Sequence, residues 1–204
     1  MTVTTTIEEV AREASTCTRC RLSSGRTQVV FGVGNPAADL MFIGEAPGFH
    51  EDKQGEPFVG AAGQLLTTLL GEIGLRREDV MIVNVIKCRP PGNRDPLPDE
   101  IEACTPYLRE QIRLVDPRII VTLGNFATRF ILDRPIGISR VRGQRFNIDG
   151  RVVIPTFHPA AILRGGGAAS QQMAAVRADF QEISRALADR PEAEQAEEEQ
   201  LGLF

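Results

Sequence analysis

The chain contains four short runs of consecutive apolar residues, separated by segments with helical or turn-rich patterns. The runs cover residues 40–43, 80–86, 119–123 and 152–157. Strands that are apolar at every position are typical of a sheet covered by helices on both faces, because neither face meets water. The pattern therefore predicts four buried strands.

The segments between the runs predict helices. Leucine and isoleucine recur at helical spacing through residues 65–73, and Gly74 follows as a stop signal. A second apolar stripe extends through residues 101–115, where Pro106 interrupts it. This stripe predicts either one kinked helix or a short turn followed by a new helix, with Thr105 as its cap and Pro106 at its first position.

Further signals mark the second half of the chain. Asn125 is expected to cap a helix that ends near Leu132, and a final helix is predicted over residues 170–188. The pair Asp149-Gly150 is a hairpin signal that leads into the fourth strand.

Alternating strands and helices predict an α/β fold, a three-layer α/β/α sandwich with a central, mainly parallel four-stranded sheet. We expect residues 1–190 to form this domain and residues 191–204 to form an acidic, disordered tail. In such folds, sites lie beyond the carboxyl ends of the strands. Three polar segments should therefore meet at one edge: GEAPG (44–48), Asn84 with KCRPPGNRDP (87–96), and HPAAILR (158–164).

Length and composition narrow the class of protein. A chain of 204 residues with 42% apolar residues and four cysteines needs no disulfides to build a core. The N-terminus shows no basic start followed by an apolar stretch, and no run is long enough to cross a bilayer. We expect a cytoplasmic monomer that makes no membrane contact, in which clustered cysteines bind metal or do chemistry.

The charge distribution leaves room for a nucleic-acid partner. Five glutamates and no Lys or Arg lie in residues 191–204, so this tail accounts for five negative charges of the net −4 and leaves +1 for the rest. A near-neutral body can carry a basic face. The candidates are Arg89, Arg94, Arg140, Arg142, Arg145 and Arg164, any of which could also be ordinary solvated arginines.

The four cysteines form two pairs that are far apart in the chain. Cys17 and Cys20 make a C-x-x-C pair, and Cys88 and Cys104 make a wider one. Four thiolates suit a tetrahedral zinc ion or an iron-sulfur cluster, and the lack of a repeated C-x-x-C favours the cluster over zinc. Four buried thiols without a ligand are the third reading. With either metal centre Cys88 would tie the N-terminal segment and the Cys104 helix to the site-bearing edge of the sheet.

Several long, ordered motifs carry a resemblance to a known family. They are GEAPG followed by Glu51 and Asp52, then PFVGAAGQLL (57–66), NVIKCRPPGNRDP (84–96), EIEACTPYL (100–108) and HPAAILR (158–164). Together they resemble the family 4 uracil-DNA glycosylases, from about Cys17 to Leu187. The resemblance implies a 4Fe-4S cluster of structural role on Cys17, Cys20, Cys88 and Cys104. It also implies an enzyme that flips uracil out of DNA and hydrolyses its N-glycosidic bond.

The resemblance also implies roles for individual residues in binding the base. Asn84 would read the uracil edge, since one amide can donate to O4 and accept from N3–H, whereas cytosine presents the opposite pattern. Phe58 would stack on the base, and His158 would donate to O2 as negative charge develops there. The backbone of Gly44, Glu45 and Ala46 would hold the base as well. Residues 162–164, Ile162, Leu163 and Arg164, would enter the minor groove, with Arg164 near phosphate.

Two carboxylates could polarise the water that attacks the sugar. Glu45 and Glu51 are the candidates, with Glu45 against the base and sugar and Glu51 oriented by Asn93. Family 1 enzymes carry an Asp where this chain has Ala46, so their assignment does not transfer. We expect monofunctional hydrolysis to an abasic site in base excision repair. The alternative is a small iron-sulfur electron carrier or nucleic-acid-binding protein without glycosylase activity. An electron carrier would need neither Asn84 nor HPAAILR.

The end of the tail carries a separate signal. After PEAEQAEEE the sequence reads Gln200-Leu201-Gly202-Leu203-Phe204. Large apolar residues at the end of a solvated segment indicate a binding function. This segment resembles the QLSLF-type motif by which bacterial repair proteins dock on the DNA sliding clamp. Gln200, Leu201, Leu203 and Phe204 are therefore predicted to bind the clamp.

Overall fold

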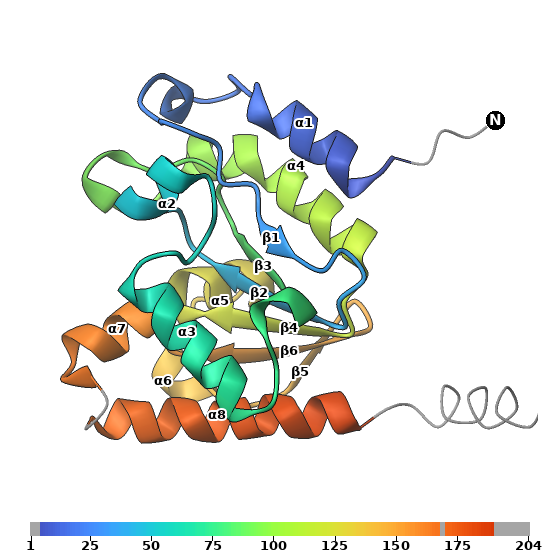
Figure 1. The fold of residues 1–204 in the computed structure, drawn as a ribbon, viewed down its shortest axis with the longest axis vertical. Coiled ribbons are helices and arrows are strands. Elements are labelled where there is room, and N and C mark those ends of the chain that lie inside the picture. The colour runs from blue at the N-terminus through green and yellow to red at the C-terminus, as the bar shows by residue number, and fades with distance from the viewer. Residues whose placement is uncertain (1–4, 168–169, 190–204) are drawn as a thin grey trace, which may run out of the picture.

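A twisted six-stranded sheet forms the centre of the computed structural model, which describes residues 5–167 and 170–189 (Figure 1). The strand order is β1-β3-β2-β4-β6-β5. The four inner strands are parallel to one another, and each edge strand is antiparallel to its neighbour. The strands are β1 (Val33–Gly34), β2 (Leu40–Gly44), β3 (Met81–Asn84), β4 (Ile119–Leu123), β5 (Phe146–Ile148) and β6 (Arg151–Thr156).

The prediction of a mainly parallel α/β sheet is confirmed, but the number of strands predicted was wrong. The four apolar runs are the four parallel strands β2, β3, β4 and β6. The two additional strands lie at the edges and have only two and three residues, β1 and β5. Segments this short show no periodicity, and their partly exposed residues do not form an apolar run. The predicted Asp149-Gly150 turn joins β5 to β6, and both of its residues have positive φ.

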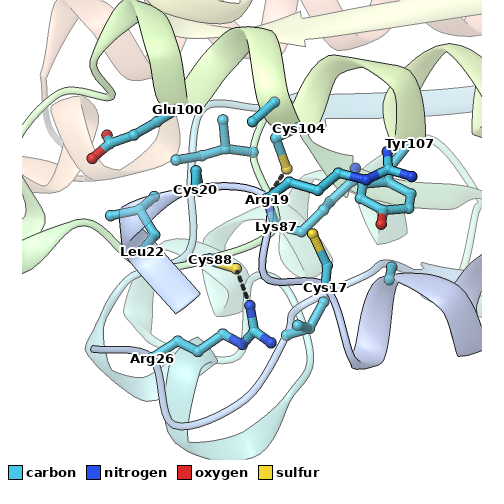
Figure 2. Close-up of a pocket in the computed structure, with 14 residues that line it drawn as sticks. Cys17, Arg19, Cys20, Leu22, Arg26, Lys87, Cys88, Glu100, Cys104 and Tyr107 are labelled. Carbon is cyan, nitrogen blue, oxygen red and sulfur yellow. Dashed lines mark hydrogen bonds between the residues drawn. The ribbon is translucent and has the colours of Figure 1, made fainter. Parts of the chain in front are cut away.

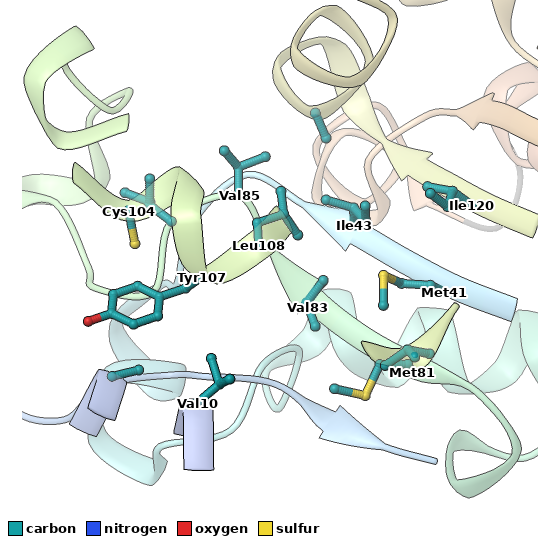
Figure 3. Packing of buried hydrophobic residues seen from close by; sticks show 14 of the residues in the cluster. Val10, Met41, Ile43, Met81, Val83, Val85, Cys104, Tyr107, Leu108 and Ile120 are labelled. Atoms are coloured by element: carbon teal, nitrogen blue, oxygen red, sulfur yellow. The ribbon is translucent and has the colours of Figure 1, made fainter. Parts of the chain in front are cut away.

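Helices pack on both faces of this sheet (Figure 1). They are α1 (Ile7–Ser15), α2 (Phe49–Gln54), α3 (Ala61–Glu72), α4 (Pro98–Val115), α5 (Gly124–Leu132), α6 (Ile138–Val141), α7 (Pro159–Arg164) and α8 (Gln171–Ala188), with short 3-10 turns at Arg21–Ser24, Arg77–Asp79 and Pro91–Asn93. Alternate residues of β2 separate the two cores. Met41 and Ile43 pack with α1, α4 and α5, as Figure 3 shows for part of this cluster, while Leu40 and Phe42 pack with α3 and α8.

Some helix boundaries differ from the predicted ones. Residues 98–115 form a single helix, α4, that contains Pro106, and the Thr105 hydroxyl donates to the carbonyl of Ile101 within it, so Thr105 caps no new helix. Helix α5 ends at Leu132 as predicted, but Asn125 does not cap it. The Asn125 Oδ1 instead accepts from the backbone N–H of Ile138 at 2.8 Å, tying α5 to α6.

The final helix follows its prediction. Ser170 caps α8, accepting from the N–H of Met173 through its hydroxyl. Among the helices of the described residues, none is long and apolar enough to cross a membrane. The acidic tail and its predicted clamp-binding residues Gln200, Leu201, Leu203 and Phe204 lie outside the described residues, so both stay predictions.

The predicted basic face is smaller than the sequence suggested. Three of its six arginines form ion pairs within the protein: Arg94 with the fully buried Glu100, Arg142 with Asp179, and Arg145 with both Glu182 and Asp189. The charge of these guanidinium groups is paired within the protein. The remaining candidates for a DNA-facing charge are Arg89, Arg140 and Arg164.

Candidate functional site

The three polar segments predicted to converge do line one pocket, beyond the carboxyl ends of the parallel strands. Strand β2 ends at Gly44, β3 ends at Asn84, and β6 is followed by His158. The pocket lining includes Glu45, Ala46 and Gly48 from the first segment, Asn84, Asn93 and Asp95 from the second, and His158, Ala160, Ala161 and Arg164 from the third, with Phe58 between them. This edge is where α/β sheets bind ligands.

Gly44 allows two of these side chains to come together. A Cβ at this position would lie 2.3 Å from Asn84 Oδ1 and 2.8 Å from Phe58 Cζ, both closer than real contacts allow. Only a residue without a side chain fits here. Glycine at the end of β2 therefore brings the Asn84 amide and the Phe58 ring to the same point of the pocket.

Asn84 presents an unusual polar group. The residue is only 2% exposed, and its Oδ1 is buried with no hydrogen-bond partner in the described residues. A buried acceptor without a partner costs free energy, roughly 1–3 kcal/mol. Such a group at the wall of a pocket is poised to accept a hydrogen bond from a ligand.

The loop that carries Phe58 is held in a strained conformation. Phe58 has φ of 55°, in the left-handed region that residues with a side chain rarely adopt. Glu51 stabilises the loop, because its Oε1 accepts from the N–H groups of Val59 and Gly60, both at 3.1 Å. Gly63 is needed as well, since a Cβ there would lie 1.6 Å from the carbonyl oxygen of Phe58. The carboxylate of Glu51 thus positions the Phe58 ring.

His158 has a defined tautomer. Its Nδ1 accepts from the N–H of Ala160 at 3.1 Å, so the ring proton lies on Nε2, and its ring stacks on Phe58 with centroids 5.6 Å apart. Burial, followed by the positive charge of Arg164, lowers the pKa of His158 to about 4, although the Glu51 carboxylate opposes the shift. At neutral pH the side chain is therefore a neutral imidazole that can donate one hydrogen bond from Nε2.

The carboxylates near the pocket differ in their surroundings. Burial, and after it the negative charge of Asp95, raises the pKa of Glu45 above its ordinary value. Asn93 forms no hydrogen bond to Glu51 within the described residues, contrary to the prediction; its Oδ1 accepts from Nε of Arg89 at 2.6 Å, and Glu51 accepts from Val59 and Gly60. Glu45 and Asp95 line the pocket as well, and among the residues that the structure describes neither forms a hydrogen bond to the loop of Phe58, which only Glu51 does.

The segment predicted to enter DNA divides into a buried and an exposed part. Ile162 is fully buried in the core beside α3 and α8, so it does not face DNA as predicted. Leu163, in contrast, is 41% exposed, and Arg164 lies at the pocket. Helical geometry explains the division, because neighbouring residues of α7 point about 100° apart and only one side of the helix faces the core.

The four cysteines surround a small internal cavity (Figure 2). Cys17 and Cys20 come from the segment after α1, Cys88 from the segment after β3, and Cys104 from α4, and all four are free thiols. Ala14, Leu22, Val29 and Ile86 supply an apolar wall. Within the described residues no group of three or more His, Cys, Asp or Glu side chains is arranged to hold a single metal ion.

Two N–H donors are directed at these sulfurs. Arg26 Nη1 donates to Cys88 Sγ at 3.4 Å, and the backbone N–H of Lys87 donates to Cys104 Sγ at 3.2 Å. Burial raises the pKa of Cys88 to about 11, which the Arg26 contact only partly offsets. Donors to sulfur and an apolar wall are features of protein sites that hold iron-sulfur clusters. The four-thiol set therefore fits such a cluster, and a metal centre would replace the thiol protons.

Lys87 joins the cysteine cavity to the pocket and was not singled out from the sequence. Its side chain is only 1% exposed, and its Nζ donates to the backbone carbonyl of Asn84 at 2.6 Å. Its own backbone N–H is the donor to Cys104. What distinguishes Lys87 is its burial between two predicted sites. Burial of a lysine is not visible in the sequence, so sequence reasoning had no signal for it.

Comparisons with known proteins agree with this geometry. Residues 31–181 match the family model described as the uracil DNA glycosylase superfamily. The type-4 uracil-DNA glycosylase of Archaeoglobus fulgidus is 50% identical over 165 residues, which is 77% of this chain and 83% of the relative. The chain belongs to the type-4 uracil-DNA glycosylases.

Other type-4 uracil-DNA glycosylases give matches of similar extent. That of Thermotoga maritima is 50% identical over 160 residues, 78% of this chain and 83% of the relative. That of Saccharolobus solfataricus is 45% identical over 194 residues, 91% of this chain and 88% of the relative. The resemblance predicted from the sequence motifs is therefore confirmed, and residues 31–181, which the family model matches, include the pocket-lining residues.

Proposed function

We propose that this protein is a monofunctional uracil-DNA glycosylase, which binds uracil flipped out of DNA and hydrolyses its N-glycosidic bond to leave an abasic site in base excision repair. The observation that carries the proposal is the buried Asn84 Oδ1, which has no partner among residues 5–167 and 170–189 and lies in a pocket shared with Phe58 and His158. Family membership supports the same reaction. An electron carrier would have no use for this pocket.

Asn84 selects the base by its hydrogen-bonding pattern. Its Oδ1 accepts from N3–H of uracil, and its amide N–H donates to O4. Cytosine has an acceptor at N3 and a donor at C4, so it would place like groups together and leave buried polar atoms unpaired. Phe58, whose ring is held by Glu51 and by its strained backbone, stacks on the base.

His158 and Glu45 act on the two charges that develop as the bond breaks. Negative charge gathers on the uracil at O2 and N1, and the Nε2–H of neutral His158 donates to O2. Positive charge gathers on the sugar. The ionised Glu45 carboxylate stabilises this charge and orients the attacking water. Water adds to C1′ of the sugar, and its proton passes to the departing uracil anion or to solvent. Leu163 and Arg164 contact the DNA beside the emptied position.

Cys17, Cys20, Cys88 and Cys104 would hold a 4Fe-4S cluster. When bound, the cluster would act as a structural staple between the N-terminal segment, α4 and the segment after β3. No step of hydrolysis passes through it. The chain's own contribution is to shield the sulfurs with apolar side chains and to donate hydrogen bonds from Arg26 and from the backbone of Lys87.

The proposal is tested by release of free uracil. The purified protein is incubated with matched labelled oligonucleotides that contain one uracil, cytosine or thymine at the same position, in single-stranded and duplex form. We expect uracil release and an abasic product only from the uracil oligonucleotides, without strand cleavage. Failure to release uracil from any of them, by protein that is folded and contains iron, would overturn the proposal.

The pH dependence of the reaction tests the role of Glu45. Because burial and Asp95 raise the pKa of Glu45, protonation should remove the required carboxylate at a pH above 4.5, the ordinary value of this group. We expect the rate to fall as the pH falls through that raised pKa. Glu45→Gln should abolish this acid limb and lower the rate roughly 10²- to 10⁴-fold. Asp95→Asn should keep the acid limb of the rate profile but move it to lower pH. If both variants show the limb at the wild-type pH, the assignment of Glu45 is refuted.

Removing one thiol tests the cysteine site. Cys88→Ser should lower the bound iron from about four atoms per chain, the content of one 4Fe-4S cluster, to near zero and bleach the brown colour. Loss of the cluster should also lower the unfolding temperature, because the N-terminal segment is no longer held. Iron content, visible absorbance and thermal unfolding measure these effects. A wild-type protein that is colourless and carries one zinc ion would contradict the cluster.

A further inference from the structure

Phe49 is one of two large apolar side chains that are exposed among the described residues. It is 46% exposed, and the other, Leu163, is 41% exposed. Phe49 is the first residue of α2 and follows the pocket-lining Gly48, while Leu163 precedes the pocket-lining Arg164. The two exposed apolar groups therefore border the same pocket, and a large apolar group left in water beside a binding site indicates a contact surface.

Two cations lie over the Phe49 ring. Lys53 Nζ and the Arg89 guanidinium carbon are each 5.1 Å from the ring centroid. The Arg89 side chain is oriented by its hydrogen bond to Asn93, which itself lines the pocket. The ring and the two cations form a single surface, which we call the Phe49 platform, made of Phe49, Lys53 and Arg89.

The acidic residues of α2 do not neutralise this platform. Glu51 accepts from the N–H groups of Val59 and Gly60. Asp52 is buried and accepts from the N–H of Thr27 at 2.9 Å. Both carboxylates are directed at the protein backbone, which leaves the charge at the surface of this short helix positive. An aromatic ring with adjacent cations suits a ligand that combines a flat apolar face with negative charge.

We propose that the Phe49 platform binds the uracil-bearing strand next to the pocket. In the complex, Lys53 and Arg89 move from the Phe49 ring to backbone phosphates, and the uncovered ring, already 46% exposed, stacks on an unpaired base that neighbours the uracil. Aromatic stacking accepts any base, and cations along the backbone provide sequence-independent affinity, so the contact suits an enzyme that must find uracil in any context. The inference rests on the proposed function only in taking DNA as the substrate.

Binding of a non-hydrolysable single-stranded oligonucleotide tests the platform. The probe contains 2′-fluoro-2′-deoxyuridine, whose fluorine slows cleavage, and affinity is measured by fluorescence anisotropy at several salt concentrations. We expect Phe49→Ala and Phe49→Leu to weaken binding about tenfold, because both lack an aromatic face, and Phe49→Trp to retain it. Lys53→Gln and Arg89→Gln should each reduce the slope of log affinity against log salt by about 0.7. Arg185→Gln, on the distant α8, is the matched charge control and should leave the slope unchanged (Figure 1).

A fluorescent base reports stacking directly. 2-Aminopurine placed on one or the other side of the uracil should be quenched by the wild type at one of these positions and remain bright with Phe49→Ala. Unchanged affinity of Phe49→Ala, equal binding by the Leu and wild-type proteins, or no quenching at either position would overturn the platform. Uracil release by the wild type is measured in parallel, so that loss of the platform and loss of the glycosylase proposal give different results.

Discussion

Asn84→Ala is expected to lower kcat/KM for uracil release roughly 10²- to 10³-fold, since two hydrogen bonds in a dry pocket are lost together. Because Asn84 Oδ1 is buried and finds no partner in the part of the chain that the structure describes, folding gains no hydrogen bond from the amide oxygen. We therefore expect the unfolding temperature to stay within a few degrees of the wild type. Activity lost without stability lost is the signature of a group kept for its ligand.

Steady-state uracil release and thermal unfolding of the same preparations measure both effects. Asn147→Ala, on the edge strand β5, removes an exposed asparagine outside the pocket and serves as the control. The assignment of Asn84 to base recognition is refuted if Asn84→Ala releases uracil at the wild-type rate. It is equally refuted if its activity falls only in step with its stability.

His158→Ala is expected to lower kcat about 10²- to 10³-fold with little change in KM, because the donor to O2 gains strength only as negative charge develops. His158→Gln can still donate a hydrogen bond from its amide and should recover part of this loss. Single-turnover rates of the two variants separate the chemical step from binding. A change in KM alone for both would mean that His158 serves binding and not bond cleavage.

The low pKa of His158 has a second measurable consequence. Since the imidazole pKa is about 4 in the folded protein and 6.5 ordinarily, the unfolded chain binds a proton between these pH values that the folded chain excludes. The free energy of unfolding should therefore rise with pH across this window. His158→Gln should lose this part of the pH dependence. Above pH 6.5 both states are neutral at this residue, and the two proteins should show parallel profiles.

The parallel core and the place of the pocket could be predicted because both depend on patterns within short segments. Fully apolar runs identified the inner strands, and the polar residues that follow them, such as Gly44, Asn84 and His158, had to meet at one edge. The edge strands β1 and β5 could not be predicted, because two or three residues carry too little pattern. Their pairing depends on neighbours distant in sequence.

The side-chain partners in the site were harder to predict than its members. Glu51 and Asn93 were expected to interact, yet Glu51 bonds the loop of Phe58 and Asn93 bonds Arg89. Ile162 was expected to face DNA, but the docking of α7 against α3 buries it. Each of these outcomes depends on how one element is rotated against another, and a motif read along the chain does not contain that rotation.

Lys87 suggests what happens when the cysteine centre is damaged. Its backbone N–H donates to Cys104 and its Nζ donates to the main-chain carbonyl of Asn84, so a disturbance of the sulfurs would reach the asparagine that we propose discriminates between pyrimidines. Oxidation of those sulfurs is then expected to silence the protein and not to relax its choice of base. For an activity that cuts bases from a genome, inactivity after oxidative injury is a safer outcome than indiscriminate excision.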